Sequence, residues 1–204
     1  YFIYFGAWTL LALTFRKWSF NMDRTGDHAN VQRSRKLAAV GLFICAFATT
    51  FAAIDWFKSL NYHWFSTMYG VWFFAASMRA ALSATVLGMF YIVTREDGLK
   101  HILKPAHFYL MGCLMLAFTI FWAYIGFSQY MLIWYANIPE ETIYFLRRNT
   151  ETWQLMSTAM VVGHFFVPFL LLLSSFGKKR PGFLCGMALW ILTMHLLDMY
   201  VIVL

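Results

Sequence analysis

Charged side chains are scarce in this sequence. Of its 204 residues, 12% are charged, which is about half of the ~25% that is typical of soluble globular domains. Hydrophobic residues make up 61% and aromatic residues 21%. A water-soluble chain of this size could not cover its surface with so few charges. The composition therefore excludes an ordinary soluble domain and a disordered chain, and it indicates a membrane protein.

Motifs for catalysis, metal binding and nucleic-acid binding are also absent. The three cysteines, Cys45, Cys113 and Cys185, lie within apolar stretches and have no CxxC spacing, so we interpret them as small buried apolar residues. No HExxH motif and no Ser/His/Asp arrangement indicates a hydrolase. The net charge of +7 comes from basic residues between apolar stretches. This pattern is typical of anchoring at a membrane surface and not of nucleic-acid binding.

Six long apolar runs predict six membrane-spanning helices, because a span needs ~20 mostly apolar residues. The runs are continuous and not alternating, which argues against strands. The predicted spans cover about 1–15, 37–54, 67–93, 106–135, 153–173 and 183–204. The fourth run is long enough that we expect its helix to be tilted or to project from the bilayer.

We thus predict an all-α integral membrane fold, a polytopic helix bundle in which residues 1–204 form a single transmembrane domain. The first and last residues both lie inside apolar runs. We therefore expect this sequence to be part of a longer protein with at least one more span.

The basic residues predict the orientation of the bundle. Twelve of them fall in loops 16–36, 94–105 and 174–182, whereas three fall in the loops on the opposite side. Cytoplasmic loops carry the excess of Lys and Arg, so we predict that loops 16–36, 94–105 and 174–182 are cytoplasmic.

The two opposite loops, residues 55–66 and 136–148, are rich in aromatic residues, which is typical of an interfacial belt. In the second loop, acidic residues directly after Pro139 suit the first turn of a helix that Asn137 or a neighbour could cap. This loop also carries charged residues that could form a docking surface for a partner: Glu140, Glu141, Arg147 and Arg148.

Few ionisable or strongly polar side chains fall inside the predicted spans, and such residues are functional candidates because they are costly in lipid. Counted by depth, they could form a proton path from Asp55 at the outer end of the second span: Asp55, Gln129, Asp198, His195, His164 and Arg79. His195 and Asp198 are three residues apart and share a helix face. The alternative is an Asp198–Arg79 pair that only satisfies two buried charges.

Pro168 adds a local argument for a polar site in the fifth span. Proline has no N–H, so the carbonyl four residues earlier, that of His164, loses its helical donor. We expect the helix to be distorted there, and the carbonyl to be satisfied by protein or by trapped water.

Two long segments carry a resemblance to a known family. Residues 55–70 (DWFKSLNYHWFSTMYG) and 121–141 (FWAYIGFSQYMLIWYANIPEE), followed by the Arg147–Arg148 pair, resemble motifs of the NrfD-like integral membrane subunits of alternative complex III. This complex is the bacterial quinol:cytochrome c oxidoreductase. The resemblance covers roughly residues 16–204.

The resemblance implies a larger NrfD-like protein of about ten spans in two four-helix bundles, in the bacterial cytoplasmic (inner) membrane. Such a subunit binds no haem or metal itself, and menaquinol or ubiquinol is the substrate of the complex. Its implied partners are a sister NrfD-like subunit thought to bind quinol, periplasmic multihaem cytochrome c and iron–sulfur subunits, the lipid bilayer and, as a further candidate, a terminal oxidase. The family's membrane subunits are proposed to conduct protons within each bundle.

Three other interpretations remain open at the level of sequence. Asp55, His63 and Trp64 in the outer loops could line a quinol site. His164 and His195, on two helices at similar depth, could ligate a haem b, which would make the chain an electron carrier. Arg79 could bind an anionic substrate in a secondary transporter.

Overall fold

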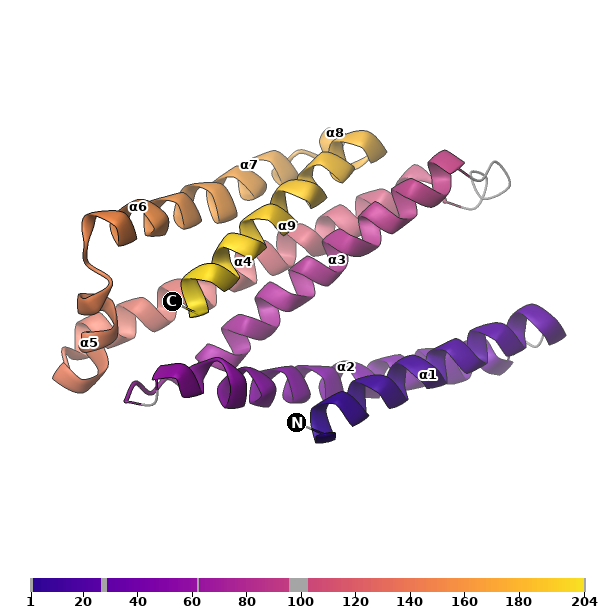
Figure 1. Ribbon diagram of the computed structural model, residues 1–204. Helices are drawn as coiled ribbons and strands as arrows, with labels where there is room; N and C mark the ends of the chain where they lie inside the picture. The colour runs from indigo at the N-terminus through magenta and orange to yellow at the C-terminus, as the bar shows by residue number, and fades with distance from the viewer. Residues whose placement is uncertain (1, 27–28, 62, 96–102, 204) are drawn as a thin grey trace.

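The computed structural model describes residues 2–26, 29–61, 63–95 and 103–203 (Figure 1). Every regular element in these residues is helical. In chain order they are α1 (Phe2–Thr25), α2 (Ala29–Trp56), η1 (Lys58–Asn61), α3 (Tyr69–Arg95), α4 (Pro105–Ala136), α5 (Pro139–Arg147), α6 (Glu151–Ala159), η3 (Met160–Phe166), α7 (Val167–Leu173), α8 (Ser175–Lys178) and α9 (Pro181–Val203).

Five helical stretches are long and apolar enough to cross a membrane, and they match the second to sixth predicted spans. They cover Ala29–Asn61, Tyr69–Arg95, Pro105–Ala136, Glu151–Leu173 and Pro181–Val203. The prediction of an all-α polytopic membrane bundle is confirmed. The predicted first span, about 1–15, is not among the five, because α1 runs on through charged residues as far as Thr25.

Helix α3 is central to the arrangement. It packs along both α4 and α9, and the rod formed by α6, η3 and α7 packs on α4 and α9 (Figure 1). The hairpin of α1 and α2 is joined to this four-rod bundle through α2, which contacts α3. The rods alternate in direction, so α5 lies at one end of the bundle and α8 at the other (Figure 1). We refer to these as the α5 end and the α8 end.

The predicted division of charge between the two ends agrees with this arrangement. The described basic residues of loops 16–36, 94–105 and 174–182 belong to the α8 end (Figure 1). Lys100, which falls in the second of these loops, lies outside the described residues. The first loop is mostly helical and not irregular, because α1 continues to Thr25 and α2 begins at Ala29.

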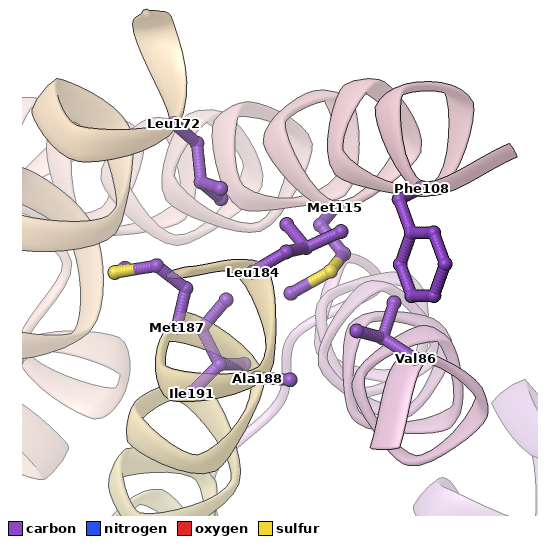
Figure 2. Packing of buried hydrophobic residues seen from close by; sticks show 8 residues of the cluster. All are labelled: Val86, Phe108, Met115, Leu172, Leu184, Met187, Ala188 and Ile191. Atoms are coloured by element: carbon purple, nitrogen blue, oxygen red, sulfur yellow. The ribbon is translucent and has the colours of Figure 1, made fainter. Parts of the chain in front are cut away.

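The apolar core forms three clusters along the bundle. The first, towards the α8 end, joins α3, α4, α7 and α9 through eight residues: Val86, Phe108, Met115, Leu172, Leu184, Met187, Ala188 and Ile191 (Figure 2). The second contains Ala75, Ala76, Trp122 and Met160. The third, towards the α5 end, contains Ala53, Trp64, Tyr69, Ile133 and Ile202. The buried ionisable residues of α3, η3 and α9 thus occur in a core that is mostly apolar.

The connection between α4 and α5 corrects one prediction. Asn137 does not cap the N-terminus of α5. It ends α4 in the left-handed conformation, with φ 51° and ψ 37°, and its backbone N–H bonds to the carbonyl of Ile133. Asparagine tolerates that conformation better than most residues. The N-cap of α5 is Ile138, without a side-chain cap, while Pro139 and the two acids occupy the first turn as predicted.

The contact between α2 and α3 depends on Gly70. A Cβ atom there would lie 2.5 Å from Cγ2 and 2.7 Å from the carbonyl oxygen of Thr50. We expect Gly70→Ala to lower the free energy of unfolding by about 1–3 kcal/mol, because the backbone of α2 would have to shift. Thermal unfolding in detergent measures the effect. Gly88→Ala in the same helix is the matched control, since nothing lies within 4 Å of its Cβ position, and an equal effect of both variants would contradict the prediction.

Candidate functional site

The fifth span changes its hydrogen bonding where the sequence predicted a defect. Residues Met160–Phe166 form a π-helical segment, in which the N–H of Val167 bonds to the carbonyl of Val162, five residues back. Pro168 follows without an N–H. In an α-helix the Gly163 carbonyl would accept from the N–H of Val167, and in a π-helix from residue 168. The first N–H is bonded to Val162 and Pro168 has none, so this carbonyl has no donor within its own helix. Such segments occur frequently at functional sites.

Side chains of two other helices donate to the carbonyls of this segment. Nε1 of Trp190 on α9 donates to the Gly163 carbonyl at 2.8 Å. Nη1 of Arg79 on α3 donates to the His164 carbonyl at 3.1 Å. The expected polar backbone group at His164 is thus present, and protein atoms satisfy it. These two hydrogen bonds join α3, η3 and α9 in the middle of the bundle.

Trp122 of α4 completes the surroundings of Arg79 and His164. The Arg79 guanidinium carbon lies 4.8 Å from the Trp122 ring centroid, and the rings of Trp122 and His164 have centroids 4.5 Å apart. Arg79 is 0% exposed and His164 1% exposed. A cation over an indole is favourable, and more so when both groups are removed from water. Residues of α4 and η3 therefore enclose the cationic side chain of α3.

Asp198 and His195 approach the same site from α9. Asp198 is 1% exposed and close enough to Arg79 and Trp122 to interact with both. His195 is half-buried and an electrostatic neighbour of Arg79 and His164. The structure therefore brings together four of the predicted proton-path residues, Arg79, His164, His195 and Asp198. We call these four residues with Trp122 the buried polar cluster.

The predicted Asp198–Arg79 pair is not a direct contact. Arg79 directs its Nη1 to the His164 carbonyl. No hydrogen-bond partner is found for its other two nitrogens, Nε and Nη2, or for Oδ2 of Asp198. The carboxylate and the guanidinium act on each other through space. The cluster is therefore not held together by a direct ion pair between Arg79 and Asp198.

Many polar atoms of the buried polar cluster lack a hydrogen-bond partner. They are Nε and Nη2 of Arg79, Nε1 of Trp122, Nδ1 and Nε2 of His164, Nδ1 of His195 and Oδ2 of Asp198. Buried polar groups without partners are rare and costly, and ordered water usually satisfies them. The cluster therefore offers several hydrogen-bonding atoms to water.

The cluster has polar neighbours on the side of the α5 end. Tyr69, at the first residue of α3, and Tyr144, on α5, are electrostatic neighbours of Asp198. Gln129 lies two helical turns from Trp122 on the same face of α4 and is 9% exposed. It borders a shallow groove of about 390 Å³ whose polar lining includes Lys58, Ser66 and Glu141. Polar side chains thus extend from the buried polar cluster towards the α5 end. Towards the α8 end lies the apolar cluster of Figure 2.

Trp64, predicted to line a quinol site, is buried at the α5 end. Its ring stacks on Tyr144 with centroids 4.0 Å apart, and its Nε1 donates to the Glu141 carbonyl at 3.1 Å. The Arg148 guanidinium lies 3.8 Å from the centroid of the Tyr144 ring. Burial raises the pKa of the Tyr144 phenol above its usual value, and Arg148 opposes part of that rise. Trp64 therefore anchors α5 to the bundle.

Asp55 and His63 lie apart from the buried polar cluster. Asp55 is exposed and accepts a hydrogen bond from the Tyr4 hydroxyl at 2.5 Å. His63 is exposed. Neither lines the groove beside Gln129. The structure therefore does not place Asp55 in a continuous track with the other predicted proton-path residues.

The predicted docking residues divide into two kinds. Glu140 and Arg147 are exposed on α5 and remain available to a partner, and Glu141 is half-exposed. Arg148 is half-buried and lies over Tyr144 and Trp153. Its role in this structure is to hold α5 against α6.

Sequence reasoning missed Trp122, Tyr69 and Tyr144 as members of this region. All three lie in aromatic-rich stretches, where a belt at the membrane interface accounts for most rings. One signal was available for Trp122, because Gln129 follows it by seven residues and must share its helix face.

The packing beside His164 and His195 bears on the alternative of a haem b. A Cβ atom at Gly163 would lie 3.0 Å from Sδ of Met194, and Trp190 bonds directly to the Gly163 carbonyl. The helices that carry the two histidines are therefore in contact at the depth where a porphyrin would have to separate them. These residues do not fit a haem in the described arrangement.

Arg79 and Pro168 should be energetically coupled. Removal of the Arg79 donor by Arg79→Leu leaves the His164 carbonyl unpaired, whereas Pro168→Ala supplies an N–H within the helix. We expect Arg79→Leu to cost less stability in the Pro168→Ala background, by about 0.5–3 kcal/mol. A double-mutant cycle of unfolding in detergent measures this coupling. Equal costs in the two backgrounds would show that the hydrogen bond does not stabilise the defect.

Comparison of this chain with protein-family models and with curated protein sequences finds no match.

Proposed function

We propose that this chain is a proton-conducting integral membrane subunit of a bacterial quinol:electron-acceptor oxidoreductase of the alternative complex III type. The single observation that carries the proposal is the buried polar cluster, in which Arg79, His164, His195 and Asp198 meet Trp122 within a mostly apolar bundle. Ionisable residues inside a membrane mark proton and ion pathways.

The chemistry of the cluster suits proton transfer. Asp198 can bind and release a proton, and the two histidines can do the same. Arg79 places a guanidinium group close enough to Asp198 to interact with its carboxyl group. The polar atoms without protein partners provide sites for the water that would carry protons between these groups.

The surroundings of the cluster favour proton exchange with the α5 end. Tyr69 and Tyr144 lie on that side of Asp198. Gln129, whose Oε1 has no hydrogen-bond partner, lines the groove with Lys58 and Glu141. Towards the α8 end, Ser83 and Thr119 bond to carbonyls of their own helices, and the apolar cluster of Figure 2 follows. The chain would then supply half of a transmembrane path.

The remaining parts of the proposal come from the resemblance. This subunit would bind no redox cofactor, and menaquinol or ubiquinol would be oxidised in the complex, with a sister NrfD-like subunit as the implied site. The exposed Glu140 and Arg147 on α5 would contact the periplasmic multihaem cytochrome c or iron–sulfur subunit. Loops 16–36, 94–105 and 174–182 would then face the cytoplasm, and a terminal oxidase is a further candidate partner.

The identity of the complex is tested by purification of the tagged full-length protein from its native membranes in a mild detergent. We expect a multihaem cytochrome c and an iron–sulfur subunit to copurify. A reduced-minus-oxidised spectrum of the chain separated from these partners should lack a b-type α-band. Purification without any haem protein would contradict the assignment to a quinol-oxidising complex, and a b-type band in the separated chain would revive the electron-carrier alternative.

Asp198→Asn tests the proton path in the intact complex. We expect quinol-driven proton release into the medium from proteoliposomes to slow by about tenfold or more, because the amide cannot carry a proton, while the copurifying subunits stay bound. Asp23→Asn is the matched control, since Asp23 is exposed on α1. If Asp198→Asn changes neither proton release nor turnover, the proposed proton path does not pass through this residue.

A further inference from the structure

Cations at the α8 end lie over aromatic rings. Nζ of Lys178 is 5.3 Å and Nζ of Lys179 is 5.8 Å from the centroid of the same Tyr109 ring. The guanidinium carbon of Arg180 lies 4.0 Å from the Phe176 ring centroid. Two ammonium groups that share one ring repel each other, so their arrangement favours a bound anion between them.

Lys178 is held in place by packing. Its side chain is 5% exposed and lies against α4, where a Cβ atom at Gly112 would be 2.8 Å from its Cγ. None of the six acidic residues that the structure describes forms an ion pair with Lys178, Lys179 or Arg180. A buried lysine stem that carries its charge to the surface is an oriented binding group and not a freely moving surface charge.

The helix termini at this end add positive potential. Helix α4 begins at Pro105 directly after Lys104, and α9 begins at Pro181 directly after Arg180. Both are long helices whose N-termini carry partial positive charge and free N–H groups. Anions, phosphate groups among them, bind favourably at such termini.

Apolar side chains border the cations on the membrane side. Leu110 follows Tyr109 and is 59% exposed, while Leu173 and Phe176 are 59% and 64% exposed. An isolated inorganic anion would gain nothing from these side chains. A lipid would gain from both parts, because its acyl chains would cover the leucines and Phe176 while its headgroup met the cations.

We propose that Lys178, Lys179, Arg180 and Tyr109 form a binding site for the phosphate headgroup of an anionic phospholipid in the leaflet at the α8 end. Lys178 and Lys179 contact the phosphate from the side of Tyr109, and Arg180 contacts it from the start of α9. The acyl chains lie along α4 and α7 over Leu110 and Leu173. This site is separate from the buried polar cluster and does not depend on the proton path.

Native mass spectrometry of the full-length protein in detergent tests this site, with phosphatidylglycerol and phosphatidylcholine as the two probes. We expect one phosphatidylglycerol to be retained in preference to phosphatidylcholine. The exposed pair Lys179→Ala/Arg180→Ala should weaken phosphatidylglycerol binding by about tenfold or more. Tyr109→Leu, which keeps every charge, should weaken it less, because it removes only the ring that positions the lysines.

Arg35→Ala/Lys36→Ala is the matched control, since it removes the same charge from exposed positions of α2 at the same end. Full retention of phosphatidylglycerol by this control would support a defined site. An equal loss in both double variants would show only general surface attraction and overturn the proposal. Displacement of the lipid by millimolar inorganic phosphate would also overturn it, because the site would then recognise the anion without its acyl chains.

Discussion

The middle of the bundle depends on the hydrogen bond from Arg79 to the carbonyl of His164. Pro168 removes a helical donor in a part of the chain where lipid and apolar side chains offer none in return. Arg79 supplies the donor from α3, and Trp190 does the same for Gly163 from α9. Because each carbonyl is bonded by a different helix, the distorted span is fixed at two points. The two hydrogen bonds thus join α3 and α9 to the distorted span, in addition to the apolar packing between them.

A guanidinium used in this way brings a charge into the core, and the arrangement of the other polar groups follows from that charge. Trp122 covers Arg79 with its ring and touches His164. Asp198 supplies the opposite charge without a direct contact, so neither group is neutralised by a fixed ion pair. The carboxyl group therefore keeps an oxygen, Oδ2, that has no hydrogen-bond partner within the protein.

Much of this could be predicted from the sequence. Continuous apolar runs predicted the five confirmed spans, and Pro168 predicted a polar defect at His164, because both follow from local covalent chemistry. Which rings and charges meet could not be predicted. The depth of each residue in the membrane led us to predict Asp55 and Gln129 on one proton path. Depth does not specify towards which neighbouring helix each side chain points. Asp55 faces Tyr4 on α1 instead, and a rotation of that kind has no signature in an apolar stretch.

The two ends of the bundle differ in a way that limits what the chain can do alone. From Asp198, polar side chains continue towards α5 through Tyr69 and Tyr144. On the α8 side, Ser83 and Thr119 bond within their own helices, and the apolar cluster of Figure 2 follows. On the proposed proton path, a proton that reached Arg79 and His164 from the α5 end would meet this apolar cluster before the basic surface. Water and polar atoms are excluded from such packing. On this proposal, a complete path across the membrane would need a movement of these helices or a second bundle beside them.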